Sequence, residues 1–302
     1  MTNEIISGFE PTKTGDLILI NTPMRDYDQR PKDDYEVLPP LGLGYIATMS
    51  SRDGHNVGLI DGEHQGIGLQ KLIDTVNSVS PRYVGINVLT PTRTIALDIA
   101  KGLNQDVSLL VGGAQASAMP KETLLEFTAF HPKTLLVTQE GELPVTALLN
   151  GVQKEFVPNL LWIDESGVVR ENETEVLLDL DSIPVLNRSF LANDPSEDKR
   201  TGLIESRVIT SRGCPFNCST CAGAREVNIT NASLRNRSPQ KVAEEIRDLT
   251  ENYGCGSIRF VDDIFIASEQ RSRSILDAIA KIGVDGFVWD ANGRANILAK
   301  FK

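Results

Sequence analysis

The residues best suited to chemistry are three cysteines, Cys214, Cys218 and Cys221, which stand within one short stretch of the sequence. A thiolate is a natural ligand for a soft metal or an iron–sulfur cluster, and three thiolates this close can reach one centre without long-range folding. Their spacing is C-x3-C-x2-C, whereas zinc sites usually present paired C-x2-C units. The spacing therefore favours an iron–sulfur cluster.

Two other interpretations of these cysteines remain open. One is a zinc site completed by Cys255 or by a distant histidine, and the other is a set of buried cysteines without a ligand. Cys255 itself precedes an apolar stretch, and we expect it to be a small buried apolar residue.

The cysteine spacing resembles that of the radical SAM superfamily. The resemblance implies that Cys214, Cys218 and Cys221 each bind one iron of a [4Fe–4S] cluster, and that S-adenosylmethionine (SAM) chelates the fourth iron. It also implies that Phe216 and Thr220 contact SAM, although Thr220 stands where the family usually has an aromatic residue. The cofactors would carry the chemistry and the protein would orient them.

Length and composition set the frame for these sites. The chain has 302 residues, 24% of them charged and 40% apolar, which indicates roughly two globular domains. Its net charge of −11 argues against a general nucleic-acid surface. Residues 1–15 lack the apolar core of a signal peptide, and we find no apolar run of the ~20 residues that a bilayer requires. Clustered cysteines without such a signal indicate the cytoplasm.

Residues 1–151 alternate short apolar runs with amphipathic segments, which predicts an α/β domain with a doubly wound parallel sheet of the Rossmann-like type. The expected strands are Leu17–Ile20, Val57–Ile60, Tyr83–Val88, Leu109–Val111 and Leu135–Val137. The expected helices are Leu41–Met49, Thr92–Leu103, Lys121–Phe127, Leu143–Leu149 and one whose apolar face carries Leu69, Leu72, Ile73 and Val76.

Such sheets bind ligands at the carboxyl ends of their strands. No G-x-G-x-x-G follows the first strand, which argues against a nicotinamide site. The segments 39–45, 111–114 and 139–142 instead resemble the cobalamin-binding domain that precedes many radical SAM domains. From the strand ends and this resemblance we expect cobalamin contacts at Thr22, Pro23, Leu41, Gly42, Asp61, Asn87, Gly112, Gly113, Glu140, Gly141 and Glu142.

The cobalamin motif D-x-H-x-x-G of mutases and methionine synthases is only partly present. Asp61 and Gly66 align with it, but Glu63 takes the ligand position and His64 is displaced by one residue. We therefore expect His64 to be a solvated loop residue and not a cobalt ligand. The acidic turn 140–142 also fits a helix N-terminus, and a domain of this kind that binds no cobalamin is an alternative.

Residues 152–200 are expected to form a hairpin and linker, and residues 201–302 the N-terminal part of a β/α barrel. The strand and helix order resembles the radical SAM barrel, with chemistry at the carboxyl ends of its strands. The resemblance implies SAM contacts at Asp262, Asp263 and Arg294. The alternatives are carboxylates at a barrel rim or helix start, and a surface salt bridge for Arg294.

The barrel strands that precede Lys302 are fewer than a radical SAM barrel has. We therefore expect a truncated chain, a split enzyme completed by a second chain, or the product of a degraded gene.

These features predict a cobalamin-dependent radical SAM enzyme that transfers a methyl group to an unactivated centre. Its expected partners are a small-molecule or peptide substrate and an electron donor such as flavodoxin or ferredoxin. The alternatives are a radical rearrangement or cyclisation, a methylthiotransferase, and a non-catalytic subunit that binds metal or cobalamin. No second cysteine triplet, which would favour the methylthiotransferase, is present.

Overall fold

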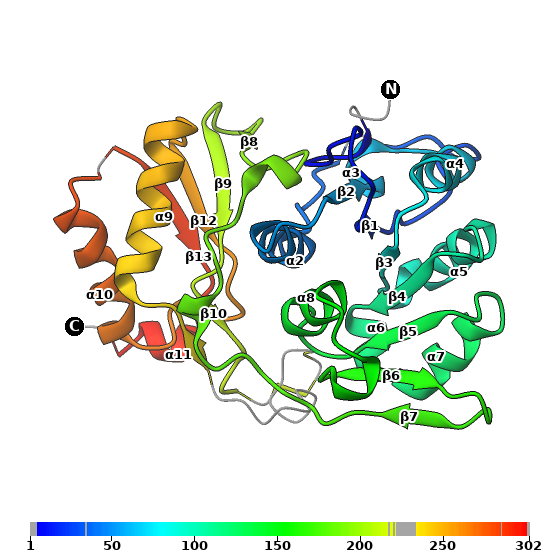
Figure 1. The fold of residues 1–302 in the computed structure, drawn as a ribbon. Coiled ribbons are helices and arrows are strands. Elements are labelled where there is room, and N and C mark those ends of the chain that lie inside the picture. Colours follow the sequence, from blue (N-terminus) through cyan, green and yellow to red (C-terminus); the bar gives the residue numbers. More distant parts are fainter. Residues whose placement is uncertain are drawn as a thin grey trace. The chain divides into compact units, whose positions relative to one another are not determined.

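The chain divides into two units, each with its own sheet (Figure 1). The first comprises Met1–Val176 and Leu186–Asn193, and the second comprises Leu177–Val185 and Asp194–Lys302. The computed structural model describes residues 5–33, 35–216, 218, 219, 221, 234–284 and 286–300. Thr220, an expected SAM contact, lies outside the described residues.

The first unit is built on a seven-stranded sheet with the order β2-β1-β3-β4-β5-β6-β7. Its strands are β1 (Leu17–Asn21), β2 (Val57–Asp61), β3 (Tyr83–Asn87), β4 (Ser108–Gly112), β5 (Thr134–Val137), β6 (Leu160–Ile163) and β7 (Val169–Glu171). Its helices are α2 (Leu41–Arg52), α3 (Gly62–Gln65), α4 (Leu69–Val79), α5 (Arg93–Gly102), α6 (Ala114–Ala118), α7 (Pro120–Thr128) and α8 (Glu142–Leu149). Single 3-10 turns are η1 (Thr90–Thr92), η2 (Lys154–Phe156) and η4 (Arg188–Phe190).

Strands β1 to β5 run parallel, whereas β6 and β7 are antiparallel additions at one edge. The order 2-1-3-4-5 is that of the flavodoxin-like doubly wound sheets, and it confirms the predicted fold class. The hairpin expected within residues 152–200 is present, but it extends this sheet instead of standing apart from it.

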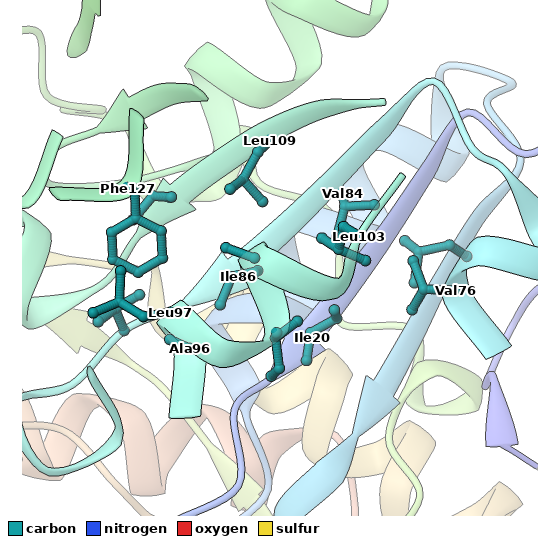
Figure 2. Close-up of a cluster of buried hydrophobic side chains, with 14 of the residues drawn as sticks. Ile20, Val76, Val84, Ile86, Ala96, Leu97, Leu103, Leu109 and Phe127 are labelled. Carbon is teal, nitrogen blue, oxygen red and sulfur yellow. The ribbon is translucent and has the colours of Figure 1, made fainter. Parts of the chain in front are cut away.

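Alternate residues of the buried strands serve two cores. In β1, Ile18 and Ile20 face one core and Leu17 and Leu19 face the other. The first core packs under α4, α5 and α7, and Figure 2 shows how side chains of these helices meet those of β1, β3 and β4. The second core packs under α2 and α8. Both faces of the sheet are therefore covered, and ligand access is left to the strand ends.

The second unit has a four-stranded sheet with the order β13-β12-β9-β8. Its strands are β8 (Ser196–Glu197), β9 (Ile204–Val208), β12 (Ser257–Phe260) and β13 (Val288–Ala291), with a separate ladder of β10 (Ser211–Arg212) and β11 (Arg235–Asn236). Its helices are α9 (Pro239–Asn252), α10 (Glu269–Lys281) and α11 (Ala295–Leu298), with the 3-10 turn η3 (Leu180–Ser182).

In this unit β9, β12 and β13 are parallel, and α9 and α10 pack side by side over one face of the sheet. Both helices begin at a serine cap, Ser238 and Ser268, whose side chain accepts a backbone N–H of the first turn. Strand, helix, strand, helix and strand thus follow in the order expected for the beginning of a β/α barrel.

Candidate functional site

The three cysteines lie beyond the carboxyl end of β9, on the segment between β10 and β11. Ser211 pairs with Asn236 and Arg212 with Arg235, so the two ends of this segment are joined by an antiparallel ladder. Cys214 is partly exposed, Cys218 and Cys221 are exposed, and all three are free thiols. The backbone N–H of Cys221 donates to the carbonyl oxygen of Cys218 over 3.1 Å, which forms a turn between them.

These thiols fit an iron–sulfur cluster in donor type and in accessibility. Within the described part of the chain, no three metal-ligating side chains already stand together in a closed metal site. Cys255 lies at the opposite, amino end of β12 and is buried in the core under α9 and α10. It is therefore poorly placed to complete a zinc site with the other cysteines.

Arg294 is the expected SAM contact that the structure brings to the cysteine segment. It follows β13, and its guanidinium carbon lies 4.1 Å from the centre of the Phe216 ring. Its Nη1 donates to the sulfur of Cys218 over 3.4 Å. Three predicted site residues from two distant parts of the sequence thus meet at the carboxyl ends of β9 and β13.

Asp262 and Asp263 are neighbours in sequence but have different environments. Asp262 is buried, and its carboxylate accepts hydrogen bonds from the backbone N–H and the hydroxyl of both Thr210 and Ser211. Asp263 is exposed to solvent. Partial desolvation, together with the neighbouring charge of Asp262, raises the pKa of Asp263 above its usual value. Asp263 is therefore the carboxylate of this pair that a ligand can reach.

A second candidate site lies at the carboxyl edge of the first sheet, which we define as the last residues of β1–β5 and the residues just after them. The last residues of three adjacent strands, Asp61, Asn21 and Asn87, stand side by side in register. Asn21 Nδ2 donates to Asp61 Oδ1 over 2.8 Å, and Asn87 Nδ2 donates to Asn21 Oδ1 over 3.4 Å. The strand order places these polar groups at the topological switch point between β1 and β3, where doubly wound sheets bind ligands.

Asn21 was not among the expected contacts. The signal that identifies it is the pairing register, because it occupies the same level of the sheet as Asp61 and Asn87. Thr22, which was expected, donates its hydroxyl to the carbonyl oxygen of Asn87 over 2.6 Å and so fixes the start of the loop after β1.

Asp61 carries an unsatisfied oxygen at this edge. Its Oδ1 also accepts the backbone N–H of His64 over 3.1 Å and thereby caps α3, whereas its buried Oδ2 has no hydrogen-bond partner among the described residues. Burial raises the pKa of this carboxyl above its usual value, which the hydrogen bonds from Asn21 and His64 partly oppose. The remaining oxygen can be satisfied by a donor such as an amide N–H group of a ligand.

Glu63, at the ligand position of the partial D-x-H-x-x-G motif, is buried and already engaged. Its carboxylate accepts the backbone N–H of Met24 over 2.7 Å and the hydroxyl of Tyr27 over 2.8 Å, and it also accepts the hydroxyl of Tyr35. His64, expected to be a solvated loop residue, is instead a half-buried residue of α3, and this burial lowers its pKa. Glu63 therefore holds the loop after β1 instead of facing a ligand.

The glycines among the expected contacts fall into two classes. A Cβ on Gly113, whose φ is +102°, would lie 2.4 Å from Asn87 Oδ1, and a Cβ on Gly141 would lie 2.6 Å from Ile46 Cδ1. The protein's own packing and backbone conformation require Gly113, whereas the close contact at Gly141 is with the movable end of the Ile46 side chain. A Cβ on Gly42, in the first turn of α2, would meet no atom within 4 Å, and one on Gly112 would meet only ordinary contacts. Gly42 and Gly112 therefore leave space that a bound ligand can fill.

The remaining expected contacts border the same edge. Pro23 follows β1, Leu41 is the first residue of α2, and Glu140–Glu142 connect β5 to α8, where Glu142 is buried in the first turn of the helix. This position supports the helix-start interpretation of Glu142.

Large apolar side chains are also exposed next to β1, β3 and α2, namely Met24, Leu89 and Leu38. The edge thus combines amide and carboxyl groups with apolar contacts, as a large amphipathic ligand requires.

The family models match one part of this chain. Residues 34–149 match the B12 binding domain, a range that contains β2 to β5 but not β1. Among the residues that the structure describes, no helix has both the length and the apolarity that a membrane span requires.

Curated relatives and solved structures extend the match beyond this domain. An uncharacterised methyltransferase of Pyrococcus horikoshii is 31% identical over 266 residues, covering 85% of this chain and 56% of the relative. The chain thus spans about half the length of the curated relatives it matches.

The solved cobalamin-dependent SAM radical enzyme OxsB, with aqua-cobalamin and SAM bound, superposes with a TM-score of 0.69 at 20% identity, covering 94% of this chain and 39% of that one. The radical SAM methyltransferase TsrM of Kitasatospora setae, with cobalamin and a [4Fe–4S] cluster bound, superposes with a TM-score of 0.67 at 18% identity. This superposition covers 89% of this chain and 53% of TsrM. At these identities the superpositions establish the fold. Together with the B12 binding domain and the Pyrococcus relative, they support the resemblance stated from the sequence: this chain is similar to cobalamin-dependent radical SAM enzymes.

Proposed function

We propose that this chain is the cofactor-binding part of a cobalamin-dependent radical SAM methyltransferase. The observation that carries the proposal is the meeting of Cys218, Phe216 and Arg294 at the carboxyl ends of parallel strands, in a chain that also has a B12 binding domain. The relatives described above, one named as a methyltransferase and others solved with cobalamin, SAM or a [4Fe–4S] cluster, support the same reaction class.

When bound and reduced by a donor such as flavodoxin or ferredoxin, the cluster and SAM supply a 5′-deoxyadenosyl radical for hydrogen abstraction, and cobalamin supplies the methyl group. Cys214, Cys218 and Cys221 would be the cluster ligands, because they are the accessible thiols of one segment. Asp263 is the exposed carboxylate suited to the amino group of SAM. Arg294 would hold Phe216 in place and offer its guanidinium to the carboxylate of SAM.

At the other site the chain's own groups would bind and orient cobalamin. Asn21, Asn87 and Asp61 can hydrogen-bond to amide groups of the corrin side chains, since amides both donate and accept. Leu38, Met24 and Leu89 offer apolar contact, and Gly42 leaves room for the ligand to approach α2. The substrate would be a small molecule or a peptide.

The test is anaerobic reconstitution with iron, sulfide and hydroxocobalamin, followed by EPR of the reduced protein with and without SAM. We expect a [4Fe–4S]⁺ signal that changes when SAM is added. Cys214→Ala, Cys218→Ala and Cys221→Ala should each lose the cluster, whereas Cys255→Ala is the matched control that keeps it. Bound zinc without a cluster, or equal iron content in all four variants, would withdraw the proposal.

Cobalamin has its own readout in the same preparation. We expect hydroxocobalamin to remain with the protein on gel filtration. A preparation that assembles the cluster but releases all of the corrin would favour radical chemistry without cobalamin.

A further inference from the structure

One arginine of α10 reaches both ends of the segment that carries the cysteines. Arg271 donates from Nε to Asn236 Oδ1 over 2.5 Å, at the far end of the segment. Its Nη2 donates at the near end to the carbonyl oxygen of Thr210 over 3.2 Å and to the Thr210 hydroxyl over 2.5 Å. Its Nη1 donates to the carbonyl oxygen of Phe265, in the turn after β12, over 2.8 Å. A single planar cation thus ties three backbone segments together.

Asp262 completes this arrangement from the end of β12. Its Oδ1 accepts the backbone N–H of Thr210 over 2.6 Å and that of Ser211 over 3.1 Å, and its Oδ2 accepts the Ser211 hydroxyl over 2.8 Å and the Thr210 hydroxyl. Arg271 Nη2 lies 3.5 Å from the same Oδ2. Both carboxylate oxygens are therefore fully used inside the protein, and the Asp262 side chain is buried.

The location of these contacts indicates what they do. Thr210 and Ser211 stand directly before the cysteines, and Asn236 stands where the chain returns in β11. The β10–β11 ladder that joins these two ends contains the pairs Ser211–Asn236 and Arg212–Arg235, and one further backbone hydrogen bond runs from the Arg237 N–H to the carbonyl oxygen of Thr210 over 2.9 Å. Such a short ladder gives little stability of its own, so the separation of the two ends depends on the side chains that bridge them.

We propose that Asp262 and Arg271 form a brace that positions the cysteine segment. Because the brace holds the ends of the segment, little conformational entropy is lost when its three thiolates bind one cluster. The inference rests on the proposed function, because it assumes that these cysteines bind a metal centre. It replaces the expected SAM contact of Asp262 with a positioning role and leaves Asp263 as the carboxylate for the ligand.

The test compares variants that keep the fold but loosen the brace. Arg271→Lys keeps the positive charge beside Asp262, but an ammonium on a flexible stem cannot reproduce the fixed fork that reaches Asn236, Thr210 and Phe265 at once. Asp262→Asn keeps the side-chain volume and removes the charge. The matched control is Arg273→Lys on the same helix, where the side chain is 62% exposed and pairs with Glu269 one turn earlier.

The readout is the affinity of the metal-free protein for Co²⁺, followed by the thiolate-to-metal charge-transfer absorption, with thermal unfolding of the same samples as a check on the fold. We expect Arg271→Lys and Asp262→Asn to bind Co²⁺ about tenfold more weakly or worse, since losing a hydrogen bond to a charged group has at least that effect. Arg273→Lys should bind like the unmodified protein. Cys218→Ala should reduce the absorption and identify it with this segment.

Equal Co²⁺ affinity in the two brace variants and the control would overturn the inference. If Asp262→Asn fails to fold, Arg271→Lys decides the question by itself. An unmodified protein that binds Co²⁺ through its thiolates but never assembles an iron–sulfur cluster would defeat the proposed function, while the ratio of Co²⁺ affinities would still test the brace.

Discussion

Replacing Gly42 and Gly113 by alanine, one at a time, should separate the space that a ligand needs from the space that the protein itself fills. Both glycines border the carboxyl edge of the first sheet. A Cβ on Gly113 would lie 2.4 Å from Asn87 Oδ1 and 2.7 Å from the carbonyl oxygen of Val88, whereas a Cβ on Gly42 would have no atom within 4 Å. The two substitutions add the same methyl group, at Gly113 to a crowded environment and at Gly42 to an open one.

The expected changes in the free energy of unfolding have opposite signs. Gly113 has a φ of +102°, which an alanine adopts only with strain of about 1–3 kcal/mol, and the overpacked methyl adds about 1–3 kcal/mol. We therefore expect Gly113→Ala to destabilise the first unit by about 2–6 kcal/mol. Gly42 is a helical residue of α2 without a clash, so Gly42→Ala should be neutral or stabilising by up to about 1 kcal/mol.

The assay combines urea unfolding with cobalamin binding. Fluorescence of the buried Trp162 in β6 follows the first unit once Trp289 of the second unit is replaced by phenylalanine, and a titration with hydroxocobalamin measures affinity. We expect Gly42→Ala to unfold no earlier than the unmodified protein yet to bind hydroxocobalamin at least about tenfold more weakly, which is about 1.4 kcal/mol. Unchanged affinity in Gly42→Ala would refute the idea that the ligand occupies the open space over α2.

Three further predictions concern stability. Burial raises the pKa of Asp61. This group therefore stabilises the folded state below its unfolded pKa, and that stability is lost as the pH rises through the folded pKa. In Asp61→Asn the urea midpoint, measured between about pH 4 and about pH 8, should fall less with rising pH than in the unmodified protein. Ser238→Ala and Ser268→Ala each remove a helix cap and should each cost about 1 kcal/mol in denaturant unfolding, and no loss in either would contradict the capping geometry. Cys255→Ala should lower the unfolding free energy of the second unit by about 1 kcal/mol while leaving its iron content unchanged, because the side chain is buried in the core.

The local hydrophobic pattern of the sequence predicts the parallel strands of the first sheet, but not that β6 and β7 extend it. Runs such as Leu17–Ile20 and Tyr83–Val88 are short, apolar and separated by amphipathic segments, and this pattern specifies buried parallel strands. The sequence of β6 and β7 predicts a hairpin, yet nothing in it indicates that β6 pairs with β5. Pairing between elements depends on tertiary packing, which a single sequence does not reveal.

The same limit applies to the sites. The cysteine spacing identified the metal-binding candidates, because chemistry restricts which residues can bind a cluster. Asp262 and Asp263 could not be told apart in sequence, since their difference arises from the neighbours that only folding supplies. Arg271 gave no signal at all, because one arginine on an amphipathic helix resembles any other until its partners are known.

The partial D-x-H-x-x-G motif shows how the first unit differs from the cobalamin domains that use a histidine. Glu63 stands at the ligand position, but its carboxylate is held by the Met24 backbone N–H and by the hydroxyls of Tyr27 and Tyr35. Releasing it toward a metal would leave these donors unsatisfied, and each charge-assisted hydrogen bond contributes about 1.5–3 kcal/mol. Asp61, which aligns with the first residue of the motif, caps α3 through the His64 backbone N–H. The residues at these positions therefore build the carboxyl edge, and Glu63 is not free to bind a metal.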